Sequence, residues 1–303
     1  MSIRCSVIFC TYNREKYIYN ALKSIAEQNF AADRYEIVLV NNNSTDSTEE
    51  LCQKFQKDFP QVDFRYFVET NQGLSYARNR GVAESRGEIL IFVDDDAMVF
   101  ENYLPAIDDF FEKYPQASAC GGPIQPVYET GEPKWLSHYT NALIGGALYE
   151  GDKLKPFNRG KYPGGGNSAY RREVFEKYGV FNVELGRKGT SLIGAEEKDL
   201  YDRLTRGNEV FYYLPEMGIY HYIPESKLTD SYFDRLTYGI GKSEYIRTRG
   251  ISSGTYLKRL AFEAIKWGAT LLLYIRYLLS FQTCKGSRLV RFRWNVSKGL
   301  LGF

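Results

Sequence analysis

Residues 89–96 read Ile-Leu-Ile-Phe-Val-Asp94-Asp95-Asp96, an apolar run that ends abruptly in three adjacent carboxylates. A short apolar run of this length is typical of a parallel strand that is buried on both faces. In open α/β sheets, ligands bind outside the carboxyl ends of such strands, so the run indicates a buried strand that delivers acid to a site. A strand that ends in a solvated acidic turn remains the alternative for this run alone.

The three carboxylates also predict a bound cation. Neighbouring like charges repel one another, and water or a cation has to offset the repulsion. Mg²⁺ and Mn²⁺ prefer hard oxygen ligands, and in enzymes they commonly carry the phosphates of a substrate. We therefore expect Mn²⁺ or Mg²⁺ at Asp94–Asp96.

Strand-like and helix-like segments alternate from residue 5 to about residue 120. Apolar runs predict strands at residues 5–10, 37–40, 64–68 and 89–93. Helical spacing of apolar residues predicts helices near residues 18–25, 51–59 and 75–86. Ser47 and Glu50 have the spacing of a capping box, which predicts a helix start there. This alternation is typical of βαβ units and predicts an α/β fold on a parallel sheet.

The chain changes character after residue 120. Glycine pairs and Gly-Pro steps break up aromatic and β-prone segments between residues 121 and 165, which predicts loops and short strands. Helices are predicted at residues 171–178 and 198–206, and a strand at 210–214. The 303 residues are enough for one large domain or two.

The cysteines and the N-terminus bear on the compartment. Five scattered cysteines without Cys-x-x-Cys spacing indicate neither a disulfide framework nor a zinc site, and they fit a reducing cytoplasm. The N-terminus opens directly into an apolar strand and does not have the pattern of a secretory signal. We therefore expect the catalytic part of the chain in the cytoplasm.

The C-terminal tail differs from the rest of the chain in charge. Residues 255–303 hold nine Lys/Arg and one acidic residue, a net charge of +8, whereas the remaining chain carries −6. This asymmetry indicates an anionic partner surface, either a membrane or a nucleic acid. No nucleic-acid-binding motif accompanies the basic residues, so a membrane is favoured.

The longest apolar stretch, residues 257–281, lies in this tail. Four polar side chains within it share one helical face: Arg259, Glu263, Lys266 and Thr270. Only residues 267–275 run without charge, well short of the roughly 20 that span a bilayer. The pattern predicts an interfacial amphipathic helix, supported by a basic aromatic segment at 288–294. A core-packed helix with a solvated basic tail is the alternative.

Several further motifs accompany the acidic run, and each is weak alone. Thr11-Tyr12-Asn13-Arg14 follows the first predicted strand, where its backbone and Thr11 could hold a nucleotide base. Arg78 stands one turn into the helix after the third strand.

Gly164-Gly165-Gly166-Asn167 permits close approach of the backbone, and successive glycines can turn N–H groups toward an anion. Glu196 and Glu197 stand at a predicted helix N-terminus, where the dipole favours ionised acid, although such a pair can also be merely exposed. His221, one of two histidines, is either a metal ligand or a hydrogen-bonded packing residue.

The order of these motifs resembles the family 2 glycosyltransferases of GT-A fold, from residue 5 to about residue 250. The resemblance rests on Thr-Tyr-Asn at 11–13, Asn-Ser-Thr-Asp at 43–46, Gly-x-x-x-Ala-Arg-Asn at 73–79, Asp-x-Asp at 94–96, Gly-Gly-Asn at 165–167 and the acidic pair before Asp199-Leu200. It implies a Rossmann-like, mixed and mostly parallel sheet flanked by helices. We expect a catalytic domain at residues 1–250, with a donor-binding half at about 1–120 and an acceptor-binding half at 121–250, and a membrane-associating helical tail at 251–303.

The resemblance implies a metal-dependent enzyme that transfers a sugar from a nucleotide-diphosphate donor with inversion at the anomeric carbon. A single displacement needs a base for the acceptor hydroxyl proton and an electrophile for the departing diphosphate. By position, Glu197 would be the base and Glu196 would orient hydroxyls. The family more often has Glu-Asp at this place, so the choice between these two residues stays open.

The same resemblance assigns the donor and metal residues. Asp94 would contact the donor ribose, and Asp96 with His221 would hold the metal, although three successive Asp leave a one-residue shift open. The residues expected to bind the donor are Thr11, Tyr12, Asn13, Arg14, Asn41, Asn42, Arg78, Asp94, Asp95, Gly165, Gly166 and Asn167. Asn41 and Asn42 stand where the family commonly has the Asp that accepts the uracil N–H. Asparagine can also accept, so a uracil or thymine donor is expected and guanine stays open.

Two other classes of protein fit part of these observations. A sugar-nucleotide nucleotidyltransferase would need a Gly-rich basic loop after the first strand, and Thr-Tyr-Asn-Arg has no glycine. A non-catalytic carbohydrate- or nucleotide-sugar-binding protein of the same fold would be expected to lose an acid from one site, and both are intact. We therefore expect an active glycosyltransferase of surface polysaccharide biosynthesis, with a glycan or lipid-linked acceptor, peripherally bound to the anionic inner face of a membrane.

Overall fold

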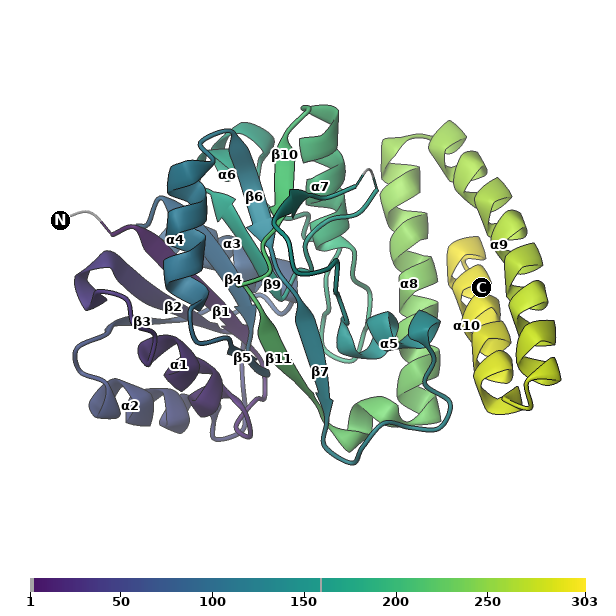
Figure 1. Cartoon of the computed structure of the whole chain (residues 1–303), viewed down its shortest axis with the longest axis horizontal. Coiled ribbons are helices and arrows are strands. Elements are labelled where there is room, and N and C mark those ends of the chain that lie inside the picture. The colour runs from purple at the N-terminus through teal and green to yellow at the C-terminus, as the bar shows by residue number, and fades with distance from the viewer. Residues whose placement is uncertain (1–2, 159) are drawn as a thin grey trace. The chain divides into compact units, whose positions relative to one another are not determined.

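Two β-sheets form the strand framework of the computed structural model, which describes residues 3–158 and 160–303 (Figure 1). The strands of the larger sheet are β1 Cys5–Thr11, β2 Tyr35–Asn41, β3 Asp63–Val68, β4 Ile89–Asp94, β6 Ala117–Gly121, β8 Lys155–Pro156, β9 Asn167–Arg171 and β10 Val210–Tyr213. The smaller sheet consists of β5 Ala97–Val99, β7 Ile124–Tyr128 and β11 Ile219–Ile223.

The helices follow the predicted alternation in the first part of the chain and dominate its last part. They are α1 Ile18–Ala26, α2 Thr48–Asp58, α3 Leu74–Glu84, α4 Tyr103–Lys113, α5 His138–Gly145, α6 Glu173–Tyr178, α7 Glu196–Arg206, α8 Asp230–Ile251, α9 Ser253–Leu279 and α10 Thr283–Leu301. Two short 3₁₀ helices lie at Ala32–Arg34 and Glu225–Leu228.

The larger sheet is mixed and mainly parallel, as predicted. Its strand order is β3-β2-β1-β4-β9-β6-β10-β8. β1 pairs in parallel with β2 and β4, and β2 with β3. β9 runs antiparallel between β4 and β6, whereas β10 pairs in parallel with β6. A first parallel half, β1 to β4, is therefore joined to a second half through one antiparallel strand.

Burial on both faces explains the unbroken apolar run of β4. Ile91 and Val93 join the core cluster that contains the inner faces of α1, α2 and α4. Leu90 and Phe92 point the other way, into the cluster with α3, α6 and α7. Successive residues of a strand face opposite sides, so a strand covered on both sides has no polar position until it reaches the sheet edge.

Several element boundaries differ from the predictions. Helix α2 begins at Thr48 as the capping-box spacing predicts, but the Ser47 side chain makes no capping hydrogen bond. The Asp46 carboxylate accepts from the Thr48 backbone N–H instead, at 3.1 Å. Helix α6 begins two residues later than predicted because Arg171 belongs to β9. The pattern of apolar residues had predicted neither α4 nor α8.

The chain divides into two compact units. Unit 1 runs up to Val127 and continues through Gly146–Phe181 and Glu197–Tyr222, and it contains the larger sheet. Unit 2 comprises Tyr128–Gly145, Asn182–Glu196 and Ile223–Phe303, and Phe233 and Leu236 lie in its own core. In unit 2, α8 groups with α9 and α10, and the predicted domain boundary at residue 250 stays a prediction. The functional division into donor and acceptor halves stays a prediction.

Two expectations about covalent and membrane structure can be compared with the fold. All five cysteines are free thiols in the structure. Among the helices of residues 3–158 and 160–303, none is both long enough and apolar enough to span a membrane.

Candidate active site

The carboxyl end of β4 carries a cluster of potential metal ligands. Asp94, Asp96 and His221 each offer one ligand atom, and these atoms lie within 4.8 Å of one another. His221 stands on β11, which pairs with β5 directly after the acidic run, so that His221 lies opposite Ala97. Its Nε2 lies 3.0 Å from Asp96 Oδ1. Two carboxylates and one imidazole fit Mn²⁺ acceptably and Mg²⁺ through the carboxylates.

The middle carboxylate of the acidic run has a different partner. Asp95 Oδ1 accepts from Arg14 Nε at 3.0 Å, and Arg14 Nη2 lies 3.5 Å from Asp96 Oδ2. Burial raises the pKa of Asp95 to about 6, and the Arg14 guanidinium opposes this shift. Arg14 therefore supplies part of the positive charge that offsets the repulsion among the three carboxylates.

The glycine turn comes close to two carboxylates. A Cβ atom at Gly166 would stand 2.0 Å from Asp94 Oδ2, and a Cβ atom at Gly165 would stand 1.7 Å from Glu197 Oε1. The turn is held there because β9, which follows it, pairs antiparallel with β4, and Asn167 lies opposite Val93. Any side chain at either glycine would displace a carboxylate, which explains the two successive glycines in physical terms.

Glu197 forms an ion pair with a buried arginine. Arg78 Nη1 lies 3.1 Å from Glu197 Oε1, and Arg78 Nη2 donates to the Gly165 carbonyl at 3.1 Å. The guanidinium also lies over the rings of Phe92 and Phe181, at 5.8 and 5.4 Å from their centroids. Arg78 thus joins α3, the glycine turn and α7, and it fixes the position of the Glu197 carboxylate.

The two adjacent glutamates differ in accessibility. Glu196 is buried, with 2% of its surface exposed, whereas 22% of the Glu197 side chain is exposed. Ala195, directly before them, has φ of 72°, in the left-handed region that non-glycine residues seldom occupy. Such backbone strain is concentrated at functional sites in proteins. Glu197 is the more accessible acid of the pair.

The side-chain amide of Asn42 forms hydrogen bonds to other residues of the chain through both its nitrogen and its oxygen. It donates to the carbonyls of Glu69 and Asn71 at 2.8 Å each, and its oxygen accepts from the Gly73 N–H at 2.7 Å. Asn41 also both donates and accepts inside unit 1. These bonds shape the loops after β2 and β3. A base contact by either side chain would have to replace one of them, and the predicted contact stays a prediction.

The side chain of Asn167 likewise forms hydrogen bonds to other residues of the chain. Its amide donates to the carbonyls of Pro123 and Met217, at 3.2 and 2.7 Å, and its oxygen accepts from the Tyr103 hydroxyl at 2.8 Å. The side chain is completely buried. Asn167 therefore anchors the turn whose glycines lie against the two carboxylates, and its predicted donor contact stays a prediction.

The Thr-Tyr-Asn turn lies at the carboxyl edge of β1, as predicted. Thr11 is buried and Tyr12 is 39% exposed. Asn13 has φ of 53°, its N–H donates to Ser44 Oγ at 2.9 Å, and its side-chain oxygen accepts from the Thr45 N–H at 2.8 Å. The turns after β1 and β2 are thus tied together beside the acidic cluster.

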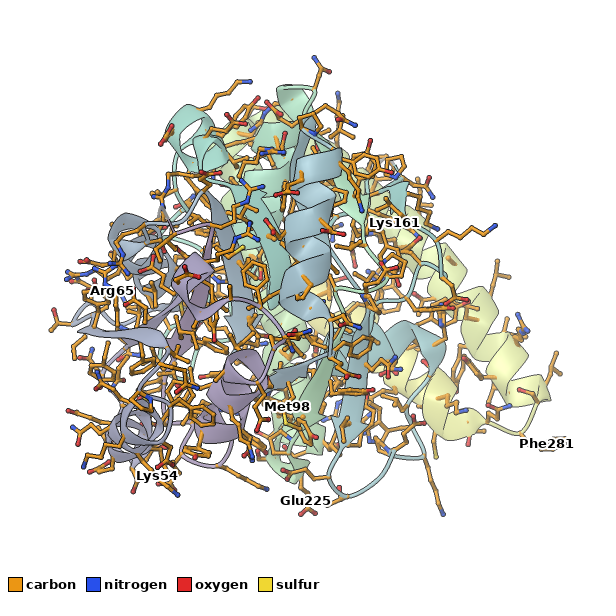
Figure 2. All side chains as sticks on the ribbon, turned by 60° about the vertical axis from the view of Figure 1, so that its left-hand side comes forward. Lys54, Arg65, Met98, Lys161, Glu225 and Phe281 are labelled. Carbon is orange, nitrogen blue, oxygen red and sulfur yellow. The ribbon has the colours of Figure 1, made fainter. Side chains whose placement is uncertain are left out.

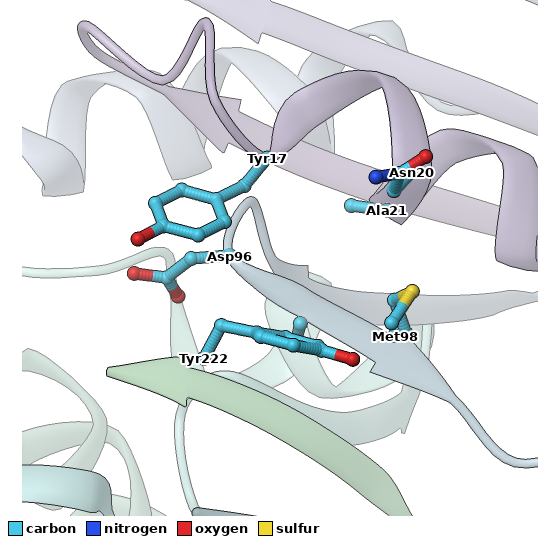
Figure 3. A pocket seen from close by; sticks show the side chains of 7 residues that line it. Tyr17, Asn20, Ala21, Asp96, Met98 and Tyr222 are labelled. Carbon is cyan, nitrogen blue, oxygen red and sulfur yellow. The ribbon is translucent and has the colours of Figure 1, made fainter. Parts of the chain in front are cut away.

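A small pocket of about 110 Å³ borders Asp96 (Figure 3). It is lined by Tyr17, Asn20, Ala21, Asp96, Ala97, Met98 and Tyr222. The Tyr17 and Tyr222 rings lie 6.4 Å apart, and the Tyr222 N–H donates to the Asp96 carbonyl at 2.9 Å. Ligand pockets usually measure roughly 300–1,000 Å³, so this pocket is a recess beside the acid cluster rather than a complete ligand site.

Known proteins resemble this chain at the level of sequence. Residues 6–179 match the family described as Glycosyl transferase family 2. A glucosyl-dolichyl phosphate glucuronosyltransferase of Haloferax volcanii is 28% identical over 217 residues, covering 69% of this chain and 66% of that protein. Glycosyltransferase GlyA of Streptococcus pneumoniae is 30% identical over 197 residues, covering 61% of this chain and 27% of that protein. The chain thus matches less than two thirds of the length of either relative.

Solved structures resemble it at the level of fold. The mannosyltransferase PcManGT of Pyrobaculum calidifontis superposes with a TM-score of 0.61 at 16% identity, covering 100% of this chain and 88% of that one. Staphylococcus aureus TarS 1–349 superposes with a TM-score of 0.55 at 18% identity, covering 99% and 92%. More than half of the sequence matches the family, and the larger sheet is mixed and mainly parallel as the resemblance implies, so the chain belongs to glycosyl transferase family 2, a family of transferase enzymes, and has the GT-A fold.

Proposed function

We propose that this chain is a metal-dependent inverting glycosyltransferase that uses a nucleotide-diphosphate sugar and a hydroxyl acceptor. The observation that carries the proposal is the pair of carboxylates at the glycine turn. Asp94 lies against Gly166 and belongs to the potential metal cluster, whereas Glu197 lies against Gly165 and pairs with Arg78. A single displacement needs two separate groups of this kind, one for the leaving group and one for the acceptor proton.

Each residue of the site has a role in this proposal. Glu197 accepts the proton of the acceptor hydroxyl. The oxygen of that hydroxyl forms a bond to the anomeric carbon while the bond between this carbon and the diphosphate breaks, and the diphosphate leaves with the electron pair. Arg78 positions the Glu197 carboxylate. Asp94, which the resemblance assigned to the donor ribose, would here join Asp96 and His221 in holding Mn²⁺ or Mg²⁺, which when bound offsets charge on the diphosphate. Arg14 positions the acidic run through Asp95.

The proposed donor is a UDP- or dTDP-sugar. Asn41 and Asn42 at the end of β2 support a pyrimidine base, either through their amides or through the loops that they shape. Among the similar structures, TarS 1–349 was solved with UDP-GlcNAc and PcManGT with GDP-Man and Mn²⁺. Both pyrimidine and guanine donors therefore belong in a direct test.

Thermal stability in the presence of donors tests the nucleotide and the metal. We expect UDP- or dTDP-sugars to raise the melting temperature with Mn²⁺ or Mg²⁺ and not with EDTA. A ligand at 100 times its Kd stabilises the native state by about 2.7 kcal/mol, which is a readily measured shift. A shift with GDP-sugars alone would change the proposed base. The absence of any metal-dependent shift would contradict the proposed donor site.

Alanine substitutions at Gly165 and Gly166 are expected to have different effects, because each glycine lies against a different carboxylate. Gly166→Ala is expected to displace Asp94 and to weaken metal-dependent donor binding. Gly165→Ala is expected to displace Glu197 and to lower turnover by about 100-fold while the donor still binds, in the range of a lost general base. Donor titrations and transfer rates of both variants check this, with Gly250→Ala as the control, because Gly250 is exposed in α8 and an added Cβ atom would meet no atom within 4 Å. Identical defects in both variants would contradict separate roles.

We further propose a glycan or lipid-linked saccharide as acceptor, in surface polysaccharide biosynthesis at the cytoplasmic face of an anionic membrane. The tail supports this, because a protein bound at the membrane surface meets lipid-linked substrates there. By its name, the Haloferax volcanii relative acts on glucosyl-dolichyl phosphate, which is itself lipid-linked. By theirs, relatives GgaA and GgaB of Bacillus subtilis take part in minor teichoic acid biosynthesis.

A further inference from the structure

Helix α9 packs in unit 2 through its polar face. Glu263 is buried and accepts from Arg259 Nη1 at 2.8 Å and from Arg293 Nη1, on α10, at 3.0 Å. Thr270, also buried, lies 3.4 Å from Arg293 Nε. The sequence predicts a helix whose apolar face is covered, either by a membrane or by the protein core. Instead, its polar face points into the bundle of α8, α9 and α10.

The opposite face of α9 is apolar and exposed. Its large side chains recur at helical spacing over six turns: Leu257, Ile265, Leu271, Leu272, Ile275 and Leu279, here called the α9 stripe. Leu272 is 71% exposed and Leu279 78%. At 1.5 Å per residue the stripe is about 33 Å long. Phe281, in the turn to α10, extends the exposed apolar surface (Figure 2). An apolar patch of this extent marks an interaction site.

The charges around the stripe are of one sign. Lys258 and Arg276 are exposed and flank one edge of it. The single acidic residue between positions 252 and 303 is Glu263, which is buried. The stripe therefore presents an apolar surface bordered by cations, which is complementary to an anionic lipid surface.

Much of the positive charge of the tail is used inside unit 2. Arg291 bonds Asp234 at 2.6 and 2.7 Å and Asp230 at 2.7 Å, and Arg288 also bonds Asp230 at 2.7 Å. Arg259 and Arg293 are paired with Glu263 as described above. These four arginines stabilise the helical bundle, so the net charge of the tail overstates the charge that it can present to a membrane.

We propose that the α9 stripe is the membrane-binding surface of this protein and that α9 lies in the plane of an anionic membrane. The stripe would enter the boundary between headgroups and acyl chains, with Lys258 and Arg276 at the level of the lipid phosphates. This inference deepens the proposed membrane association, but it does not rest on transferase activity. It assigns the binding to an apolar face rather than to the arginines of α10.

A second copy of the chain fits the stripe less well than a membrane does. An antiparallel pairing of two α9 helices about the middle of the stripe would place Lys258 of each copy opposite Arg276 of the other. A parallel pairing would place Lys258 opposite Lys258 of the other copy, and Arg276 opposite Arg276 of the other copy. Both arrangements bring like charges together beside an apolar contact, with no exposed acid on α9 to compensate.

Vesicle co-sedimentation of the full chain tests the assignment. The probes are vesicles of phosphatidylcholine alone and with 30 mol% phosphatidylglycerol, roughly the anionic content for which basic flanks matter. We expect Leu272→Ser with Ile275→Ser to weaken binding to the anionic vesicles by about 30-fold, because two of the six large apolar side chains of the stripe no longer insert. Lys258→Gln with Arg276→Gln should weaken it about fivefold per cation removed, and only at low salt. Val180→Ser, an exposed apolar residue of unit 1, is the matched control and should bind like the wild type.

Three other outcomes would contradict the assignment of the α9 stripe as the membrane-binding surface. Unchanged binding of the serine variant would exclude the stripe, and failure of the wild type to sediment with either vesicle would exclude the membrane. A dimer in light scattering that the serine substitutions dissociate would identify a second copy as the occupant. The melting temperature of each variant verifies that the bundle is intact. Because vesicle binding needs neither donor nor acceptor, failure here and failure of the transferase proposal are distinguishable.

Discussion

Glu197→Gln is expected to lower the rate of sugar transfer by about 10³-fold, within the range attributed to a positioned general base, while the donor binds nearly as well as before. The substitution keeps the size of the side chain and its place against Gly165, and Arg78 can still donate to the amide oxygen. What it removes is the ability to accept the acceptor proton. Single-turnover transfer rates and donor-dependent melting shifts, measured on the same preparation, check the expectation.

Glu196→Gln is the matched control for this prediction, because it makes the same chemical change one residue away at a buried position. We expect it to retain more activity than Glu197→Gln. If Glu196→Gln shows the larger loss of turnover with donor binding intact, the base is Glu196. If Glu197→Gln weakens donor binding as much as turnover, Glu197 serves the donor rather than the acceptor.

Much of unit 1 could be predicted because its strands are apolar on both faces. Ile91 and Leu90 face different helical layers, so the apolar run of β4 has no helical or alternating pattern that could be misinterpreted. The acids after it could be located for the same reason, since the end of such a strand is the edge of the sheet. Helix α4 was missed although Leu104 and Ile107 are buried, because the short β5 strand and a turn separate it from the acidic run.

Most partners inside the site could not be predicted from the spacing of residues, because they depend on pairing between distant strands and helices; the family resemblance had grouped His221 with Asp96. Arg14 meets Asp95 only because β1 and β4 are neighbours in the sheet. His221 reaches Asp96 through the pairing of β11 with β5. No spacing in the sequence encodes either contact. The residue types alone leave the choice between the two glutamates open, and in the structure the greater exposure of Glu197 and its ion pair with Arg78 distinguish them.

The orientation of α9 is a different kind of failure. Its polar residues recur at helical spacing, and on a surface helix that pattern normally marks the face toward water. Here the charges of that face are matched by partners on neighbouring helices. Arg293 and Arg259 neutralise Glu263, so the face can be buried. Periodicity identifies two faces of a helix, but the residues of other elements decide which face is covered.

Asp96→Asn is expected to raise the Mn²⁺ concentration needed for donor binding by about 10- to 100-fold or more, because the loss of even an outer-shell partner of a metal ligand commonly costs that much. The substitution keeps the shape of the side chain but removes one charge from the cluster of Asp94, Asp96 and His221. Donor-dependent melting shifts across a Mn²⁺ titration provide the measurement.

Asp95→Asn is the control, because it removes the same charge from the neighbouring residue, whose carboxylate is bonded to Arg14. We expect that control to lower the melting temperature without donor, since it leaves Arg14 short of a partner, yet to retain the wild-type Mn²⁺ requirement. A variant at Asp96 that binds donor with the wild-type metal dependence would move the metal site to other carboxylates, and the grouping of Asp94, Asp96 and His221 would then have to be explained by packing alone.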